Sequence, residues 1–454
     1  MYAVLKYLAV FAGLGSLFYV SGRSFLGVQR RTLPSTAIAA GLVLNILFAM
    51  ITCQVVGALV TQALTTLLLW AVQLWRRPKV AAEREVTILG ARFVLGLSLA
   101  AVGFLLLCVV DPIKDWDARS MWFYHAKVIY HTQSIWAGGA WAREANIYTH
   151  LNYPKLFSLL AAQVATLLGF WNEYAPKMAI ALLALPMLAF YCEAWPRNAG
   201  NPGESKISAL LYTAMLTLLI FGFDGSGFFL LNGYMDGWVA LYICLATIAW
   251  AGAGNLGQAF VFLALVAELK QEGLILAAMV LLIGLALQAR HLRTLLGSLD
   301  RPSLLLKVAK LAVLTLPIFA WLIAVKVQHL ARSHYSGNTL ERILARLSTP
   351  TDYGWILANI LLHNAIVLPS LILALTLVIA LYRTRRGLSN ILLLPGLSAI
   401  AYCGVVFCVY LATNADLYWH LGASAGRVGL TPGLLLATFN MLAIHHLVCN
   451  KRAA

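Results

Sequence analysis

Acidic side chains stand beside the ends of apolar segments at several points in the chain. The first set follows the apolar segment 93–110 and consists of Asp111, Asp115 and Asp117. A carboxylate can act as a general base toward a hydroxyl group, and it can also cap the first turn of a helix. Both interpretations are open for Asp115 and Asp117, which precede the amphipathic stretch 118–131. On a helix the two side chains would point in different directions, so we expect one of them to face a given substrate.

The segment that follows these acids is rich in aromatic rings. It contains four tryptophans between residues 111 and 160, namely Trp116, Trp122, Trp136 and Trp141. A mere connector would be shorter and would not need so many rings. Rings next to carboxylates suit a carbohydrate site, but rings also form belts at the membrane surface. The sequence leaves both interpretations open.

Three further groups could contribute chemistry. Asp236 opens a later apolar segment, where it could cap a helix, orient an acceptor or, together with Asp117, hold a divalent metal. Lys270 and Glu272 lie in a short turn between two apolar segments, either as a local ion pair or as part of a site.

Near the C-terminus, Arg427 begins an apolar segment and His420 precedes it. Arginine binds phosphate through two parallel hydrogen bonds, which predicts a phosphate site at Arg427. The alternative is an interfacial arginine whose charged end reaches toward water. His420 could bind phosphate or a metal, or could be structural.

The composition is that of a protein whose solvent is largely lipid. Of the 454 residues, 61% are hydrophobic and 11% are charged, and the mean hydropathy is +0.82. Soluble domains carry about 25% charged residues, whereas apolar runs of about 20 residues can cross a bilayer as helices. The alternating pattern of a β-barrel is missing from the sequence. We therefore expect an all-α, polytopic transmembrane helical bundle.

Apolar runs and basic clusters together predict a topology. We expect about 13 spans by the 20-residue rule. They fall near residues 2–20, 36–55, 57–75, 93–110, 177–194, 206–222, 236–252, 254–269, 272–289, 311–328, 364–382, 390–411 and 428–446. The net charge is +16, and Lys and Arg cluster around residues 23–31, 76–92, 290–310, 383–386 and 451–452. Such clusters mark cytoplasmic loops, so we expect no nucleic-acid partner.

This map places most acidic residues outside. The predicted outer loops are 111–176, 223–235, 329–363 and 413–427. Parity requires a single net crossing over 156–194, so the apolar stretch 156–170 is expected to lie at the outer surface as an amphipathic interfacial helix. Residues 1–92 are expected to form an N-terminal addition to a core that spans residues 93–454.

Four motifs resemble the GT-C superfamily of integral membrane glycosyltransferases. They are Asp115-Trp116-Asp117-Ala118 with the following Trp122, Tyr124, His125 and Lys127; His150-Leu151-Asn152-Tyr153-Pro154-Lys155-Leu156; Gly233-Tyr234-Met235-Asp236-Gly237; and Lys270-Gln271-Glu272-Gly273. The first resembles the acidic start of the first outer loop, and the second resembles the element that closes that loop. The third resembles a second acidic position, and the fourth resembles an element of bacterial members. The resemblance covers residues 93 to about 290, and more loosely the rest of the chain.

The resemblance implies a function for these residues. GT-C enzymes move a sugar from a polyprenyl phosphate or pyrophosphate to a lipid, glycan or protein acceptor, at the outer face of the membrane. It implies that Asp117 is the catalytic base, with Asp115 as the second candidate. With such a donor, the phosphate site predicted at Arg427 would hold the donor phosphate, and His420 is a further candidate for substrate binding. The substrate-binding residues expected from the motifs are Asp236, Lys127, His125, Lys155, Tyr153, Glu272 and Lys270. It also implies the bacterial inner membrane as the location and membrane lipid as the surroundings.

Two other functions are compatible with the sequence. A transporter or lipid flippase would place charges near the middle of the membrane and show paired repeats, of which the chain has no convincing example. A polymerase of lipid-linked glycans would usually depend on a large late loop, whereas here the early loop is richer. Neither a phosphate-binding loop nor a dinucleotide-binding motif occurs, which agrees with a lipid-borne donor.

Overall fold

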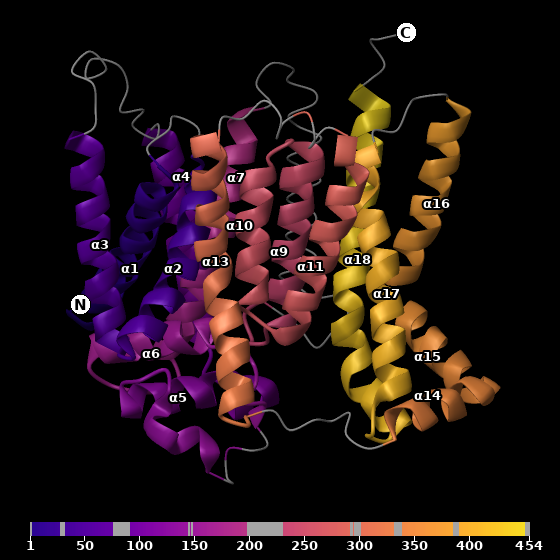
Figure 1. Ribbon diagram of the computed structural model, residues 1–454, viewed down its shortest axis with the longest axis horizontal. Coiled ribbons are helices and arrows are strands. Elements are labelled where there is room, and N and C mark those ends of the chain that lie inside the picture. Colours follow the sequence, from indigo (N-terminus) through magenta and orange to yellow (C-terminus); the bar gives the residue numbers. More distant parts are fainter. Residues whose placement is uncertain are drawn as a thin grey trace.

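The fold was obtained as a computed structural model, which describes residues 2–27, 32–75, 91–143, 146, 149–197, 230–290, 294, 301–330, 338–384 and 390–449. Over these residues the chain is all-α and forms no strand. Long helices lie side by side as a bundle, and shorter helices lie across one of its ends (Figure 1).

The helices follow the apolar runs of the sequence closely. The long ones are α1 (Tyr2–Leu26), α2 (Pro34–Thr52), α3 (Val55–Trp75), α4 (Ala91–Val110), α7 (Met178–Arg197), α13 (Arg301–Val327), α16 (Val367–Arg383), α17 (Leu394–Ala412) and α18 (Leu417–Cys449). Three shorter apolar helices belong to the same bundle: α9 (Asp236–Thr247), α10 (Leu256–Ala267) and α11 (Gln271–Leu287).

The bundle is that of an integral membrane protein. In the described part of the chain, eight helices are long and apolar enough to cross a membrane, or nine if a bent helix pair counts as one span. The expected span at 206–222 lies outside the described residues. The total of about 13 spans therefore stays a prediction.

The N-terminal helices pack directly into the bundle. The apolar stretch 36–75 forms two helices, α2 and α3, as the sequence predicts. Helix α2 is buried along most of its length and packs against α1, α3, α7 and α10. A Cβ atom on Gly22 would lie 1.8 Å from the Ala37 carbonyl oxygen, and one on Gly41 would lie 1.9 Å from that of Phe18. These glycines let the backbones of α1 and α2 approach closely, as small residues do in membranes.

Polar contacts identify the helix ends that share one side of the bundle. Glu193, near the end of α7, accepts hydrogen bonds from the Ser35 backbone N–H at 2.6 Å and from Ser35 Oγ at 2.8 Å. Gln258 in the first turn of α10 donates to the same Ser35 Oγ at 2.8 Å. Lys310 of α13 donates to the Leu26 carbonyl at the end of α1. The start of α2, the end of α7 and the start of α10 therefore lie together.

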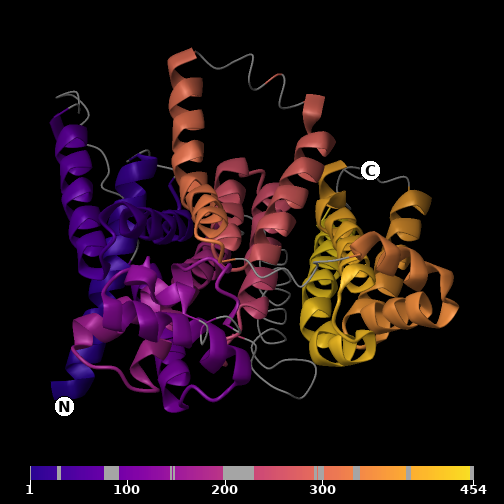
Figure 2. The ribbon, with the colours of Figure 1, turned by 60° about the horizontal axis from the view of Figure 1, so that its bottom comes forward.

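The opposite side carries a layer of short helices. Helices α5 (Phe123–Thr132) and α6 (Leu156–Leu168) lie across the bundle end there (Figures 1 and 2). With 13 residues, α6 is about 20 Å long, well short of the ~30 Å hydrocarbon core. Its placement agrees with the prediction that 156–170 does not cross. However, α6 is covered on nearly all sides, by α5 as well as the bundle, so it is not an amphipathic surface helix.

The C-terminal part differs from the expected boundaries. Helix α18 begins at Leu417, so Arg427 lies inside a helix and the expected outer loop 413–427 is much shorter. The expected outer loop 329–363 contains two helices, α14 (Thr339–Ser348) and α15 (Pro350–Leu362). Helix α15 meets α16 at a bend of 77°. The spans were predicted from hydropathy, and polar residues in the first turns of α18 lower the hydropathy there without ending the helix.

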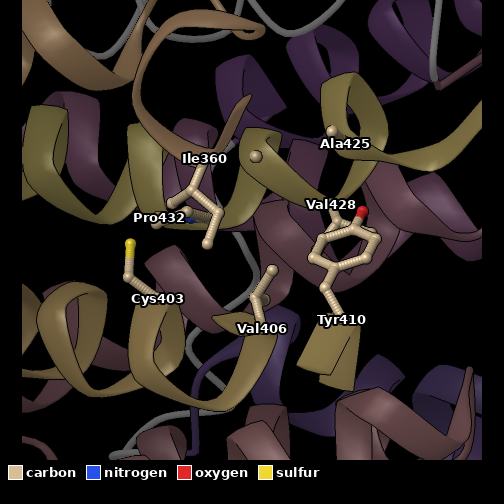
Figure 3. Close-up of a pocket in the computed structure, with 8 residues that line it drawn as sticks. Ile360, Cys403, Val406, Tyr410, Ala425, Val428 and Pro432 are labelled. Atoms are coloured by element: carbon tan, nitrogen blue, oxygen red, sulfur yellow. The ribbon is translucent and has the colours of Figure 1, made fainter. Parts of the chain in front are cut away.

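A small apolar cavity lies between α15, α17 and α18 (Figure 3). Ile360 of α15, Cys403 and Val406 of α17, and Val428 and Pro432 of α18 contribute to its lining. No charged side chain lines it.

Candidate functional site

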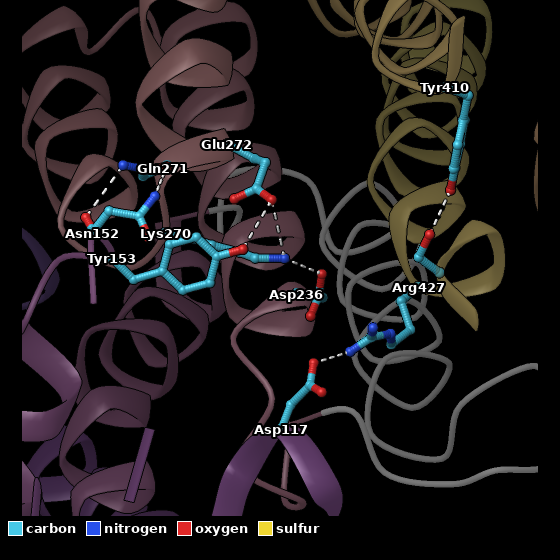
Figure 4. A network of polar contacts seen from close by, with 10 residues as sticks. Asp117, Asn152, Tyr153, Asp236, Lys270, Gln271, Glu272, Tyr410 and Arg427 are labelled. Atoms are coloured by element: carbon cyan, nitrogen blue, oxygen red, sulfur yellow. Dashed lines mark hydrogen bonds and ion pairs between the residues drawn. The ribbon is translucent and has the colours of Figure 1, made fainter. Parts of the chain in front are cut away.

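Asp117 and Arg427 form an ion pair that joins the two halves of the chain. Arg427 Nη1 donates to Asp117 Oδ2 (Figure 4). Asp117 precedes the short π-helical segment η2 (Ala118–Trp122), and its side chain caps no backbone N–H there. The side chains are 18% exposed for Asp117 and 27% for Arg427. The capping interpretation of Asp117 is therefore not realised, and the carboxylate points at a cation.

Arg427 lies well inside an apolar helix. It is the eleventh residue of α18, which places it about 15 Å along the helix from Leu417. Its guanidinium carbon is 5.0 Å from the centroid of the Tyr234 ring, a cation–π distance. Ionisable residues inside membrane helices carry a high desolvation penalty, and they commonly mark functional sites.

A second group of charges lies beside this pair. Lys270 Nζ is 2.9 Å from Asp236 Oδ1 and 3.6 Å from Glu272 Oε1. The Lys270 and Asp236 side chains are only 13% and 10% exposed. Burial alone would lower the pKa of Lys270, but the Asp236 and Glu272 carboxylates outweigh it and hold that pKa well above its ordinary value. Lys270 is therefore a cation at neutral pH.

Short turns place these charges. Gly233 has φ +90°, and a Cβ there would lie 2.8 Å from the Phe123 ring. The turn before Asp236 can therefore pack tightly against the start of α5, next to Asp117. A Cβ on Gly273 would lie 2.4 Å from the Val266 carbonyl oxygen. Close packing of α10 against α11 thus fixes the turn that holds Lys270.

Residues 152–153 close the cluster on the side of the segment that follows α4. Tyr153 Oη donates to Glu272 Oε1 at 3.4 Å, and Asn152 Nδ2 donates to Gln271 Oε1 at 2.7 Å (Figure 4). The Tyr153 ring is stacked on Trp122, with centroids 5.4 Å apart and an interplanar angle of 12°. Burial, and next the Glu272 carboxylate, raise the pKa of Tyr153, so its hydroxyl stays protonated. The segment predicted to close the loop does reach the second charged group.

Lys155 belongs to a different, buried network. Its ammonium lies 5.0 Å from the ring centroid of Trp141 and 4.9 Å from that of Trp321. It is 3.1 Å from His125 Nδ1 and donates to the Leu151 carbonyl at 3.0 Å. Burial lowers the pKa of Lys155 well below its ordinary value. The structure thus does not bring Lys155 to the charged cluster, and it holds the loop segment that carries Tyr153.

His125 is the partner of Lys155 and is fully buried as well. Its Nε2 is 3.0 Å from Thr149 Oγ1, and Thr149 Oγ1 itself donates to the Asn146 carbonyl. This pattern fits a neutral ring that donates from Nε2 and accepts at Nδ1. Burial, followed by the neighbouring Lys155, lowers the pKa of His125 well below its ordinary value.

Three other predicted site residues lie outside the cluster. Lys127 is exposed on α5, and Asp115 is partly exposed two residues before Asp117. His420 is in α18, where its Nδ1 is 3.1 Å from Thr413 Oγ1 and its ring packs against Tyr410. His420 therefore holds the start of α18 against the end of α17.

Sequence reasoning did not assign a role to four neighbours of the site. Tyr234, Asn152 and Gln271 lie within the quoted motifs, next to residues that were assigned. Burial and then the Asp117 carboxylate raise the pKa of Tyr234, which lies under Arg427. Trp321, whose indole N–H donates to the Asn152 carbonyl at 3.0 Å, lies in the middle of an apolar run without a sequence signal.

A divalent metal at Asp117 and Asp236 finds little support in the donor set. Each of these carboxylates is paired with a cationic side chain, Arg427 or Lys270. Among the described residues, no three His, Cys, Asp or Glu side chains are grouped so that they could hold a metal ion.

Comparison of the chain with protein-family models, with curated proteins and with solved structures found no match. The resemblance to GT-C glycosyltransferases therefore depends on the motifs quoted from the sequence.

Proposed function

We propose that the protein is an inverting glycosyltransferase, which moves a sugar from a polyprenyl phosphate or pyrophosphate to an acceptor hydroxyl. One observation carries the proposal. Four charged side chains from separate parts of the chain meet at one end of an apolar bundle: Asp117, Asp236, Lys270 and Arg427. Transfer from a phosphate leaving group needs a base for the acceptor hydroxyl and cations that stabilise the departing phosphate, and this group of side chains offers both.

In this proposal Asp117 is the base. Its carboxylate removes the proton from the acceptor hydroxyl while that oxygen attacks C1 of the sugar. The bond between C1 and the phosphate oxygen breaks, and its electron pair leaves with the phosphate. C1 is inverted because attack and departure occur on opposite faces.

The cations would hold the phosphate. Arg427 offers a planar pair of N–H donors, and Lys270 offers a compact positive charge. Asp236 influences both, because it binds Lys270 directly and also interacts electrostatically with Arg427. A phosphate would share these cations with the carboxylates and so loosen the pairing of Asp117 with Arg427.

The membrane accounts for the lipid donor. Because Arg427 lies within an apolar helix, a phosphate bound there would keep its polyprenyl chain in the hydrocarbon.

We place this end of the bundle outside the cytoplasm. Lys310 contacts the end of α1 on the opposite side, where basic clusters mark the cytoplasmic face. On this basis the location is the bacterial inner membrane, with acceptors that are lipids, glycans or proteins.

The test is transfer of radiolabelled sugars from polyprenyl phosphates by the purified protein in lipid bilayers. Asp117→Asn should lower the rate by about 100-fold to 10,000-fold, as loss of a general base does. Asp111→Asn is the matched control, because Asp111 lies in the same loop and pairs with Lys114 on the surface. Full activity of both Asp117→Asn and Asp115→Asn would refute the catalytic assignment.

A transporter or a lipid-linked glycan flippase or polymerase is the alternative, and the depth of Arg427 in α18 is the observation that favours it. The same bilayer assay separates these functions by where the label ends. The proposed transferase moves the label onto an acceptor without a polyprenyl carrier, and a polymerase moves it onto another lipid-linked glycan. A transporter or flippase moves the label across the bilayer and leaves it on its own carrier.

A further inference from the structure

Helix α14 exposes a continuous apolar face. Leu340, Leu344 and Leu347 are 68%, 58% and 44% exposed. Their spacing of four and three residues places them on one side of the helix. No residue of α14 is buried, so this side has no covering partner within the described residues.

A second side of α14 binds the end of α17. Arg346 Nη1 donates to the carbonyls of Tyr410, Leu411 and Thr413 at 2.7, 3.0 and 2.8 Å. Arg342 lies four residues earlier on the same side and contacts the same helix end. The last carbonyls of a helix lack partners and carry partial negative charge, so these arginines satisfy them. The basic side of α14 therefore faces protein rather than water.

The third side of α14 is polar and exposed. Glu341 and Ser348 lie about 100° around the helix axis from the leucines, on the side away from the two arginines. One helix thus presents separate apolar, basic and polar sides. These three sides fit a helix at the membrane surface: the apolar side faces hydrocarbon, the polar side faces water, and the basic side faces the protein.

The apolar face continues into surfaces of the membrane-spanning helices. Trp355 of α15 is exposed and contacts the ring of Tyr418, whose centroid is 6.4 Å away. Tyr418 and its neighbour Trp419 are exposed as well, at the first turn of α18. Tryptophan and tyrosine are enriched where hydrocarbon meets the lipid headgroups. Beyond the bend, α16 exposes apolar side chains such as Ile372.

We propose that α14 lies in the plane of the bilayer surface, with Leu340, Leu344 and Leu347 against the acyl chains of the leaflet. The occupant of the apolar face is membrane lipid. The helix then fixes the depth of the α17–α18 turn, because Arg346 binds the carbonyls at the end of α17. The adjoining helix α15 contacts the start of α18, where Tyr418 Oη donates to Asp352 Oδ1 at 3.3 Å. This inference does not depend on the proposed function.

A photoreactive side chain tests the inference. Benzoylphenylalanine is placed at Leu344, at Glu341 or at Ile372, in the full chain reconstituted in phosphatidylcholine bilayers. After irradiation, intact-mass spectrometry measures the adduct with phospholipid. The yield at Leu344 should be comparable to that at Ile372 and severalfold above that at Glu341. A probe at Leu340 repeats the measurement on the same face in case the first variant folds poorly.

Two outcomes overturn the inference. Equal phospholipid yields at Leu344 and Glu341, both below the yield at Ile372, would show that the leucine face does not contact acyl chains. A covalent dimer formed through the probes at Leu344 and Leu340 would show that a second copy of the chain covers this face.

Discussion

Arg427 donates to Asp117 across 310 residues of sequence. One partner lies just after α4 and the other lies three turns into α18, so the pair ties the segment after α4 to the last helix of the bundle. An arginine at this depth in an apolar helix is costly unless it is paired, and the same holds for the carboxylate. The pair is therefore a structural bond in the free protein, whatever chemistry it also performs.

Reversal of the pair separates these two roles. Asp117→Arg and Arg427→Asp should each lower the stability by about 3 to 5 kcal/mol, because each places two like charges together in a partly buried place. The double variant restores attraction and should recover most of that loss. It should not recover glycosyl transfer, since base and phosphate site have exchanged places. Thermal unfolding in detergent and the bilayer transfer assay provide the two readouts. Recovery of both would mean that the pair acts only as a structural bond.

The ion pair of Lys270 and Asp236 can be removed as a whole, so that neither buried charge is left without the other. Lys270→Met removes the cation that the Asp236 carboxylate contacts directly, at 10% exposure, and should cost about 3 kcal/mol. Asp236→Asn combined with Lys270→Met removes both charges and should restore most of the stability. Transfer should stay low in both variants, with the larger effect on the KM for the lipid donor. If the double variant transfers sugar normally, Lys270 does not bind the phosphate.

Much of this architecture follows from local sequence features. The helices were predictable because apolar runs of sufficient length have few alternatives in lipid. Asp117, Asp236, Lys270 and Glu272 were identified because charges at the ends of apolar runs stand out. Their pairing was not predictable. Neither composition nor spacing says that Arg427 meets Asp117 rather than water, since that depends on how distant helices pack.

The buried network shows the other limit of sequence reasoning. His125 and Lys155 lie in the motifs of the first outer loop and were expected to bind substrate. In the structure they bind each other beneath the loop, between the rings of Trp141 and Trp321. Polar residue types alone do not distinguish a substrate-binding lysine from one that holds a loop in place. Trp321, which comes from a distant helix, decides between the two.

Gly233 should be sensitive to a single added methyl group. In Gly233→Ala the new Cβ meets the Phe123 ring at 2.8 Å, and the residue must keep φ at +90°. Backbone strain and overpacking together should cost about 2 to 4 kcal/mol. The turn would move away from η2 and take Tyr234 and Asp236 with it, so transfer should fall by more than the loss of folded protein explains.

Gly254→Ala is the control for this substitution. Gly254 also has positive φ, +64°, but a Cβ there meets nothing within 4 Å. It lies just before the start of α10, on the side of the bundle opposite the charged cluster. It should lose about 1 kcal/mol from backbone strain and keep its specific activity. Equal effects of the two substitutions would show that strain alone, rather than contact with Phe123, accounts for the result.

The His125 network predicts a pH dependence of stability. The unfolded chain binds a proton at His125 near pH 6.5, whereas burial, with Lys155 as neighbour, keeps the folded pKa well below that value. The unfolded state therefore binds more protons as the pH falls below 6.5. Stability should decrease by about 1.4 kcal/mol for each pH unit until the folded pKa is reached. His125→Gln can still accept from Lys155 and donate to Thr149 without titrating, so it should remove the His125 contribution and make the slope shallower between pH 6.5 and pH 5. His131→Gln, at an exposed position on α5, should behave like the unmodified protein. Thermal unfolding of the three proteins from pH 8 to pH 5 measures the slopes; parallel slopes for His125→Gln and the unmodified protein would mean that other groups carry the pH dependence.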